Sequence, residues 1–197
     1  MSSNTRIPPT EVTGLYGMVV RRFSERLLGR MPEQVGVYWH NPKILRFFMG
    51  LGQKSQKWHE CDEDLKSLAH MAVSSVVGCS WCLDFGYLMA HNSGLDEAKV
   101  REVPKWRESD VYTPLERDVL TYAEAMSHTP PTVTDALVER LSEAIGEAAL
   151  IELTAFIGLT NVTTRMNVAL GIQSQGFAAS CGLPPLASPS GNVASST

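Results

Sequence analysis

The sequence predicts an all-α protein, and three observations lead to this prediction. Apolar residues recur at helical spacing along most of the chain, and residues that favour helix ends lie between the apolar segments. No segment shows the alternation of apolar and polar residues that marks a half-buried strand. The chain has 197 residues, of which 44% are hydrophobic, and this is enough for one domain with a sizeable core.

Two helices are expected in the first quarter of the chain. Residues 15–28 carry apolar side chains at helical spacing, and Gly29 follows as a C-terminal stop. The next helix opens at Asn41 and Pro42, because Asn accepts backbone N–H groups at a helix start and Pro fits the first helical position. This helix is expected to continue to about Leu51.

The next two helices meet at a pair of closely spaced cysteines. A helix begins near Asp62, where acidic residues favour the positive end of the helix dipole, and Gly78 is its natural stop. Cys79 and Cys82 follow directly, and the apolar pattern then resumes as far as residues 92–94. The cysteines are therefore predicted to lie at a helix–turn–helix junction, close to the start of the second helix.

Proline and capping residues divide the segment that follows. A short helix over residues 96–103 is expected to stop at Pro104. Thr113 opens the next helix with a capping box, in which Glu116 stands three residues after the Thr cap. That helix is expected to end at about Ser127, before two consecutive prolines.

The last third of the chain completes the predicted organisation. Helices are expected over residues 134–145 and from about 146 to 173, and residues 150–158 are apolar nearly all round. Such a stretch is expected in the core or in a subunit interface. Residues 188–197 are small and polar and are predicted to be a disordered tail, which leaves residues 1–187 as one helical domain.

The composition excludes several classes of protein. The formal net charge is −4, so the basic patch of a nucleic-acid-binding protein is not expected. No stretch approaches the roughly 20 apolar residues of a membrane span, and the first residues lack the pattern of a secretory signal. We therefore expect a cytoplasmic protein, in which four cysteines do not form a disulfide scaffold and closely spaced ones are catalytic or metal-binding.

The segment from Cys79 to Cys82 has the chemistry of a thiol redox site. Two sulfurs one helical turn apart share a face and can form a disulfide with little backbone movement. The unpaired N–H groups of a helix start lower a thiol pKa and increase the fraction of nucleophilic thiolate. A second thiol nearby can convert a sulfenic acid to a disulfide before further oxidation.

Two other readings of the pair stay open at this point. Free cysteines can pack as small apolar residues of the core. A zinc site is the other alternative, but it needs two more ligands, and no second closely spaced pair exists among the available side chains, which are Cys61, Cys181, His70 and His91.

Several segments around and after the cysteine pair carry a family resemblance. They are residues 68–73, 78–82, 94–96, 152–161 and 164–171. In these segments the sequence resembles the carboxymuconolactone decarboxylase family, and specifically its alkylhydroperoxidase D-like branch. The resemblance covers about residues 35–175, and the two cysteines after an apolar helix are its most specific feature.

The resemblance implies a fold, an activity and partners. The fold is a single-domain helical bundle that assembles into homo-oligomers, commonly trimers or multiples of them. Cys82 would attack a hydroperoxide and become a sulfenic acid, and Cys79 would resolve it to a disulfide. An external dithiol, such as a lipoyl-carrying protein or a small molecule, would reopen the disulfide, and no organic cofactor or metal is expected.

The sequence departs from this branch at the residues that move protons. Ser67 stands where the family has Glu, and Gly86 stands where it has His four residues after the second cysteine. Trp81 replaces a further His that some members carry. We expect His70, one turn after Ser67 on the same helix, to be the candidate replacement. Gly86 would either open a pocket beside the sulfur or allow close helix packing.

Polar residues on the last long helix need partners. Asn161, Arg165 and Asn167 are expected to bond across helices or subunits, because buried polar groups are paired, and an anion site at Arg165 is the alternative.

Three functions follow from these observations. The leading hypothesis is a thiol-dependent oxidoreductase that reduces a hydroperoxide or exchanges disulfides. The first alternative is a lactone decarboxylase, which would not need Cys82. The second is a non-catalytic helical oligomer or thiol sensor that lacks the family's proton relay.

Overall fold

The computed structural model describes residues 5–188, and these residues are helical or irregular with no strand. The all-α prediction is therefore confirmed for this part of the chain. The helices are α1 (Gly14–Leu28), α2 (Glu33–Tyr38), α3 (Pro42–Ser55), α4 (Glu63–Val77), α5 (Ser80–Ser93), α6 (Glu97–Glu102), the 3₁₀ helix η1 (Val103–Glu108), α7 (Pro114–Ser127), α8 (Asp135–Ile145), α9 (Glu147–Ala169) and α10 (Phe177–Ser180). Within the described residues, no helix is long and apolar enough to cross a membrane.

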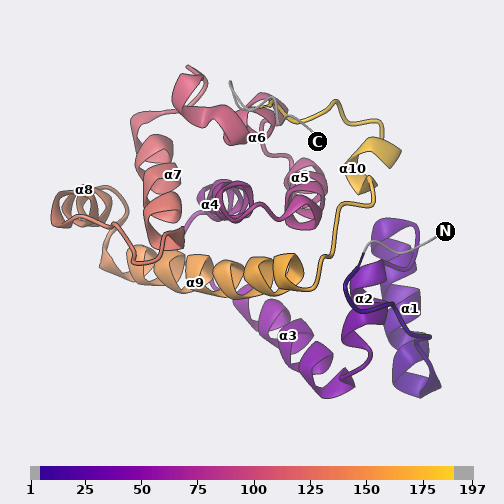
Figure 1. Cartoon of the computed structure of the whole chain (residues 1–197). Coiled ribbons are helices and arrows are strands. Elements are labelled where there is room, and N and C mark those ends of the chain that lie inside the picture. The colour runs from indigo at the N-terminus through magenta and orange to yellow at the C-terminus, as the bar shows by residue number, and fades with distance from the viewer. Residues whose placement is uncertain (1–4, 189–197) are drawn as a thin grey trace.

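Helix α4 is the centre of the fold, and α5, α7 and α9 pack around it (Figure 1). Its side chains include Leu68, Met71 and Val73, which have no exposed surface. The helix begins where the carboxylate of Asp62 accepts hydrogen bonds from the backbone N–H groups of Asp64 and Leu65. Because α4 is buried on most sides, it fixes the positions of the helices that carry the cysteines and the polar residues.

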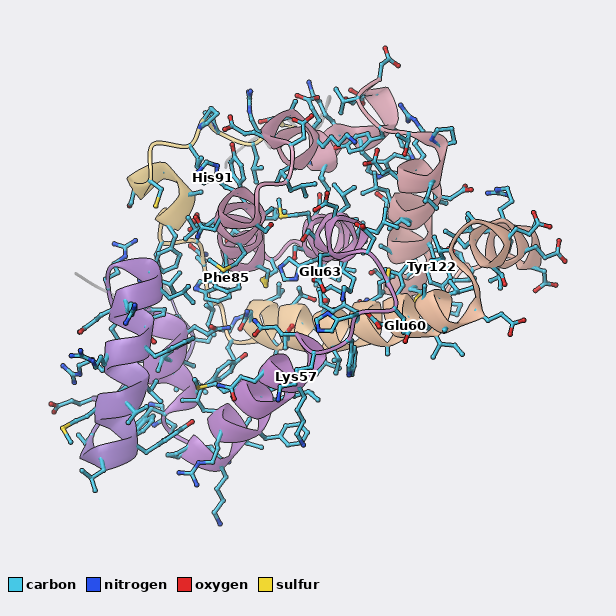
Figure 2. The ribbon with its side chains drawn as sticks, turned by 180° about the vertical axis from the view of Figure 1, so that it is seen from behind. Lys57, Glu60, Glu63, Phe85, His91 and Tyr122 are labelled. Carbon is cyan, nitrogen blue, oxygen red and sulfur yellow. A yellow bond between two sulfur atoms is a disulfide. The ribbon has the colours of Figure 1, made fainter. Side chains whose placement is uncertain are left out.

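A buried ion pair joins α4 to α9. The ammonium of Lys66 lies 2.8 Å from Glu152 and 2.7 Å from Glu63, and it also donates to the carbonyl of Trp58. The second oxygen of Glu152 accepts from the backbone N–H of Glu60, which lies beside α9 in Figure 2. Both members of the Lys66–Glu152 pair are buried, and their hydrogen-bonding groups are satisfied.

Helices α1 to α3 form an N-terminal arm at one side of this core (Figure 1). Helix α2 contacts the end of α9, since Tyr38 and Gln34 both hydrogen-bond to Asn167. The outer face of α1 is apolar and solvent-exposed, with more than half of the surface of each of these side chains accessible: Leu15, Met18, Val19 and Phe23.

The predicted helix ends agree with the structure at most positions. Gly29, Gly78 and Gly94 all end helices in the left-handed conformation. The capping box of Thr113 and Glu116 is present in both of its hydrogen bonds. Pro42 begins α3 as expected, although the side chain of Asn41 makes no capping hydrogen bond.

Four elements differ from the predicted helices. The six-residue helix α2 and the four-residue helix α10 were not predicted, because each is too short to show a helical repeat. Helix α6 ends at Glu102, just before Pro104 as expected, but the 3₁₀ helix η1 follows directly and was not predicted; Pro104 occupies its first turn, where the missing N–H is not needed. Helix α9 ends at Ala169, four residues before the expected end.

Of two further expectations, one about burial is met in part, and one about the C-terminal tail is not tested. Leu150, Leu153 and Ile157 are buried as predicted. Phe156 is only half-buried, and Ala155 and Ile151 are exposed, the latter to 71%. The predicted disordered tail lies outside the described residues, apart from Ser188.

Candidate functional site

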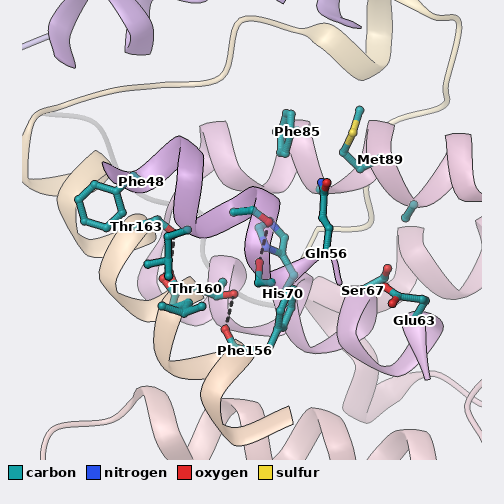
Figure 3. Close-up of a pocket in the computed structure, with 16 residues that line it drawn as sticks. Phe48, Gln56, Glu63, Ser67, His70, Phe85, Met89, Phe156, Thr160 and Thr163 are labelled. Carbon is teal, nitrogen blue, oxygen red and sulfur yellow. Dashed lines mark hydrogen bonds between the residues drawn. The ribbon is translucent and has the colours of Figure 1, made fainter. Parts of the chain in front are cut away.

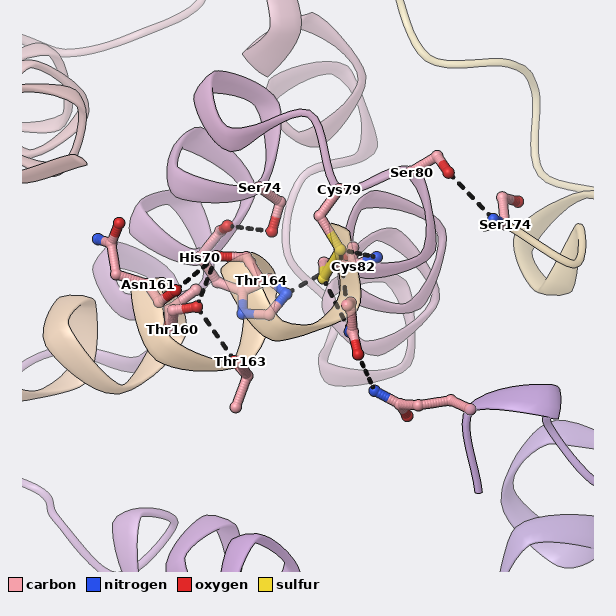
Figure 4. The surroundings of a disulfide bond; sticks show 12 residues. His70, Ser74, Cys79, Ser80, Cys82, Thr160, Asn161, Thr163, Thr164 and Ser174 are labelled. Carbon is pink, nitrogen blue, oxygen red and sulfur yellow. Dashed lines mark hydrogen bonds between the residues drawn. A yellow bond between two sulfur atoms is a disulfide. The ribbon is translucent and has the colours of Figure 1, made fainter. Parts of the chain in front are cut away.

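The two cysteines are bonded to each other at the junction between α4 and α5 (Figure 4). Gly78 ends α4 in the left-handed conformation, which turns the chain so that Cys79 becomes the N-cap of α5. The sulfur of Cys79 accepts a hydrogen bond from the backbone N–H of Cys82 at 3.2 Å. The predicted junction and the predicted sulfur–sulfur bond are thus both present, with Cα atoms 5.2 Å apart.

The disulfide is enclosed by apolar side chains. Cys79 has no exposed surface and Cys82 is 3% exposed. The cluster around them contains Val37 from α2, Phe177 from α10, and Trp81, whose ring stacks on Phe85 with centroids 5.0 Å apart. The N-terminal arm and the C-terminal segment therefore both cover the sulfurs, and Cys82 is the less enclosed of the two.

Asn167 on α9 contacts both sulfurs. Its side-chain nitrogen Nδ2 lies 3.4 Å from the sulfur of Cys82 and 3.9 Å from that of Cys79. Its oxygen Oδ1 accepts hydrogen bonds from Tyr38 at 2.7 Å and from Gln34 at 2.9 Å. The expected bonding across helices is confirmed for Asn167. No local sequence pattern connects this residue with the cysteines, which are 85 or more positions away in the sequence.

The other two polar residues of this helix have structural partners. Asn161 donates to the hydroxyl of Ser127 and to the carbonyl of Ile157. Arg165 donates to the carbonyl of Ser127, so both residues join α9 to the end of α7. These contacts confirm the expectation that polar residues of the helix bond across helices.

His70 lies beside the cysteine pair. Its Nε2 is 3.2 Å from the backbone carbonyl oxygen of Cys82 (Figure 4). Burial lowers the pKa of His70 from its usual value, and the hydrogen bond to Cys82 only partly opposes this effect. A carbonyl oxygen can only accept a hydrogen bond, so in the neutral ring Nε2 carries the proton and Nδ1 is the basic nitrogen.

Gly86 allows His70 to occupy this position. A Cβ atom added to Gly86 would lie 2.7 Å from Cδ2 of His70 and 2.8 Å from the sulfur of Met71. Of the two roles expected for Gly86, close helix packing against α4 is therefore shown, and Gly86 also forms part of the wall of a cavity. The imidazole of His70 fills the space that a side chain at position 86 would need.

A cavity of about 340 Å³ lies next to His70, between α3, α4, α5 and α9 (Figure 3). Ser67, His70 and Gly86 all contribute to its wall. Its larger side chains are mainly apolar: Phe48, Leu51, Phe85, Met89, Phe156 and Leu159. Cys82, Phe85, Gly86 and Met89 recur at helical spacing on α5, so the same helix face that lines the cavity leads to the sulfur.

Asp84 and the two other cysteines, Cys61 and Cys181, are not bonded to the sulfur pair. The carboxylate of Asp84 accepts from Ser174 and from the backbone N–H groups that begin α10. Cys61 is buried and its pKa is raised to about 11, mainly by that burial, whereas Cys181 is exposed. Across residues 5–188 no three His, Cys, Asp or Glu side chains are grouped to hold a metal ion.

The sequence matches a known family and a known relative. The sequence model of the carboxymuconolactone decarboxylase family matches residues 42–125, from α3 to α7. The uncharacterized protein YnjA of Escherichia coli (strain K12) is 38% identical over 137 residues, which are 69% of this chain and 73% of YnjA.

Two solved structures share the fold. The first matches nearly the whole chain, and the second is described as a candidate AhpD protein. The debrominase Bmp8, in a Cys-to-Ala variant bound to 2,3,4-tribromopyrrole, has a TM-score of 0.77 and 26% identity, covering 92% of this chain and 98% of that chain. A protein of unknown function from Agrobacterium tumefaciens, described as a candidate AhpD antioxidant defence protein, has a TM-score of 0.65 and 25% identity. That match covers 70% of this chain and 94% of the other.

Proposed function

The chain belongs to the carboxymuconolactone decarboxylase family, in its alkylhydroperoxidase D-like branch, and from this premise we propose that it is a thiol-dependent oxidoreductase. The observation that carries the proposal is the bonded pair of Cys79 and Cys82 at a helix start, with His70 and an apolar cavity beside it. The substrate is a small organic hydroperoxide. The mainly apolar cavity wall favours an organic substrate over hydrogen peroxide.

The first step takes place at Cys82. Its thiolate attacks the outer oxygen of the hydroperoxide, so a sulfur–oxygen bond forms and the oxygen–oxygen bond breaks. The leaving alkoxide takes a proton and departs as an alcohol, and Cys82 becomes a sulfenic acid. Cys82 has this role because it is the less enclosed cysteine and lies on the helix face that leads to the cavity.

The second step involves Cys79. Its thiolate attacks the sulfur of Cys82, the disulfide forms, and the hydroxide group leaves as water after taking a proton. The N–H of Cys82 already donates to the sulfur of Cys79, which supports a thiolate at this position. The same contact makes Cys79 a good leaving group when an external dithiol, such as a lipoyl group, attacks Cys82 and restores the reduced pair.

His70 is the proposed proton carrier. Its neutral ring has a basic nitrogen, and it stands next to both the cysteine and the cavity. In the family pattern a Glu and a His perform this task at the positions of Ser67 and Gly86. Here the imidazole comes from α4 instead and fills the space beside Gly86. Proton transfer of this kind contributes about 10²- to 10⁴-fold in rate.

Reductive removal of a halogen from a small ring is the second candidate function. The similarity to the debrominase Bmp8 extends over 92% of this chain, and the cavity is large enough for a small aromatic ring. In that reaction the Cys82 thiolate would take the halogen, the ring carbon would take a proton, and Cys79 would displace halide as the disulfide forms. The dithiol supplies two electrons in both reactions.

One experiment tests the proposal and separates the two candidates. Reduced protein carrying Cys181→Ser is mixed with cumene hydroperoxide or with a tribrominated pyrrole. The loss of thiols, the formation of cumyl alcohol and the release of bromide are measured. The matched control adds Cys82→Ser. Rapid loss of two thiols with cumyl alcohol formation, abolished by Cys82→Ser, is the expected result. Bromide release instead would favour the second candidate.

Other outcomes would overturn the thiol mechanism. Oxidation no faster than that of an ordinary exposed thiol, with either substrate, would leave a non-catalytic oligomer or thiol sensor. Lactone decarboxylation that persists in Cys82→Ser would support the decarboxylase alternative.

We also expect a homo-oligomer, a trimer or a multiple of one. The exposed apolar face of α1 supports this expectation, because monomers rarely leave so large a continuous apolar stripe in water. Light scattering of the full chain decides it, and a monomer mass would contradict it.

A further inference from the structure

Asn167 has an environment that suits a hydrogen-bond donor to sulfur. It is 1% exposed on the last turns of α9, and both ends of its amide have partners. The two donors on Oδ1 come from α2, which belongs to the N-terminal arm, and Nδ2 faces Cys82 and Cys79. The side chain of Asn167 therefore connects Tyr38 and Gln34 of the N-terminal arm to the sulfur of Cys82.

The two partners on α2 fix the orientation of the amide. An Asn amide has nearly the same shape in both orientations, so its hydrogen-bond partners decide which end is which. Burial raises the pKa of Tyr38 to about 12, so its hydroxyl keeps its proton and donates to Oδ1. Gln34 donates to the same oxygen, and Nδ2 is therefore directed at the sulfurs.

We propose that Asn167 is a catalytic residue of the thiol site, whose amide N–H donates to the sulfur of Cys82 and stabilises the thiolate there, with Tyr38 and Gln34 as positioning residues. This inference rests on the proposed function. A buried thiol resists ionisation, because the charged form loses its water. A fixed N–H donor offsets that cost, since hydrogen bonds to charged groups are about twice as strong as neutral ones.

Ionisable side chains near Cys82 do not supply an equivalent donor among the described residues. His70 uses Nε2 for the carbonyl of Cys82. Asp84 is occupied by Ser174 and the start of α10, and Arg30 lies over the ring of Phe177 at 5.0 Å. Tyr38 acts through Asn167.

The test measures the ionisation of Cys82 without any substrate, so it can fail or succeed independently of the proposed activity. In protein carrying Cys79→Ser and Cys181→Ser, the rate of Cys82 alkylation by iodoacetamide is followed against pH by peptide mass spectrometry. Asn167→Leu has nearly the same volume and no donor. We expect its alkylation profile to shift to higher pH by about one to two units.

A matched control comes from the same helix. Asn161→Leu removes an amide that bonds Ser127 and Ile157 instead of sulfur, so its profile should match that of the parent. A profile unchanged in Asn167→Leu, or shifted equally in both variants, overturns the proposal.

Tyr38→Phe provides a second variant that keeps the ring and loses only the hydroxyl. It is expected to shift the profile in the same direction by a smaller amount, because Oδ1 of Asn167 keeps one donor. Circular dichroism establishes that each variant is folded. If Asn167→Leu does not fold, Tyr38→Phe decides the matter, and an unshifted profile in this folded variant overturns the proposal.

Discussion

The imidazole of His70 occupies the space that a side chain at position 86 would fill, since a Cβ atom on Gly86 would lie 2.7 Å from Cδ2 of His70. The absence of the family's His at position 86 and the position of His70 on the neighbouring helix are thereby related. The ring of His70 on α4 packs against α5 at Gly86, where there is no side chain. A proton-carrying group thus reaches the same region from a different helix.

Gly86→Ala is expected to destabilise the protein. The added methyl group would meet His70 and Met71 at less than 3 Å, and His70 is held by its bond to Cys82. Overpacking of this kind costs about 1–3 kcal/mol. Urea denaturation measures the change in the free energy of unfolding.

Gly50→Ala is the matched control for that substitution. Gly50 also lies inside a helix, but a Cβ there meets nothing within 4 Å. It should stabilise the protein by up to about 1 kcal/mol, because Ala favours a helix interior over Gly. Equal effects at both positions would contradict the close contact of His70 with Gly86.

His70→Gln is expected to weaken the acid sensitivity of the fold. The folded-state pKa of His70 lies below its unfolded value, so the unfolded chain binds more protons between these two pKa values. The wild-type free energy of unfolding is therefore highest above about pH 6.5 and falls as the pH drops, by up to about 1.4 kcal/mol per pH unit. The free energy of unfolding of His70→Gln should fall less over the same pH range.

Urea midpoints at pH 7.5 and pH 5.0 check this expectation. At pH 5.0 the carboxylates still carry most of their charge, so the difference between the two proteins reports mainly on His70. An equal fall in both would show that burial does not disfavour the charged imidazole.

The long helices could be predicted because local signals and burial agree. In α4 the Asp62 cap, the apolar repeat and Gly78 all mark the same segment. Helix α7 is similar, with its Thr113 capping box at one end. Short elements such as α2 could not be predicted, since their position is set by contacts with distant residues, such as that of Tyr38 in α2 with Asn167 in α9.

The candidate site also has a part that could be predicted from local sequence and a part that could not. Cys79 and Cys82 are neighbours in sequence, so their geometry follows from helix spacing and a Gly stop. The contact of Asn167 with sulfur joins residues far apart in the chain, and no local pattern encodes it. Its one signal was a polar side chain on an apolar helix, which indicates a partner without identifying it.

Lys66→Met is expected to destabilise the protein strongly. The substitution leaves the Glu152 carboxylate buried without its cation, and breaking a buried pair in this way costs about 3–5 kcal/mol. The double variant Lys66→Met with Glu152→Leu should recover much of the loss, because no unpaired charge remains. Chemical denaturation of the three proteins decides the matter, and a double variant no more stable than Lys66→Met would contradict this explanation.

The same pair predicts a response to acid. Burial alone would raise the pKa of Glu152, but the hydrogen bonds from Lys66 and from the backbone of Glu60 and Cys61 hold it below the usual range. Its contribution to stability is present above the unfolded-state pKa of about 4.3 and is lost as the pH falls through the lower folded-state value. Between pH 5 and pH 3, the double variant should therefore lose less stability than the wild type.

The four cysteines are expected to react in three distinct classes. In the oxidised native protein a maleimide should label Cys181 alone, because Cys61 is buried and its pKa is raised to about 11. Unfolding without a reductant should expose Cys61 as a second site. Cys79 and Cys82 should be labelled only after reduction, since their sulfurs are bonded to each other. Peptide mass spectrometry identifies each site, and labelling of Cys82 before reduction would show that the pair is not oxidised in the folded protein.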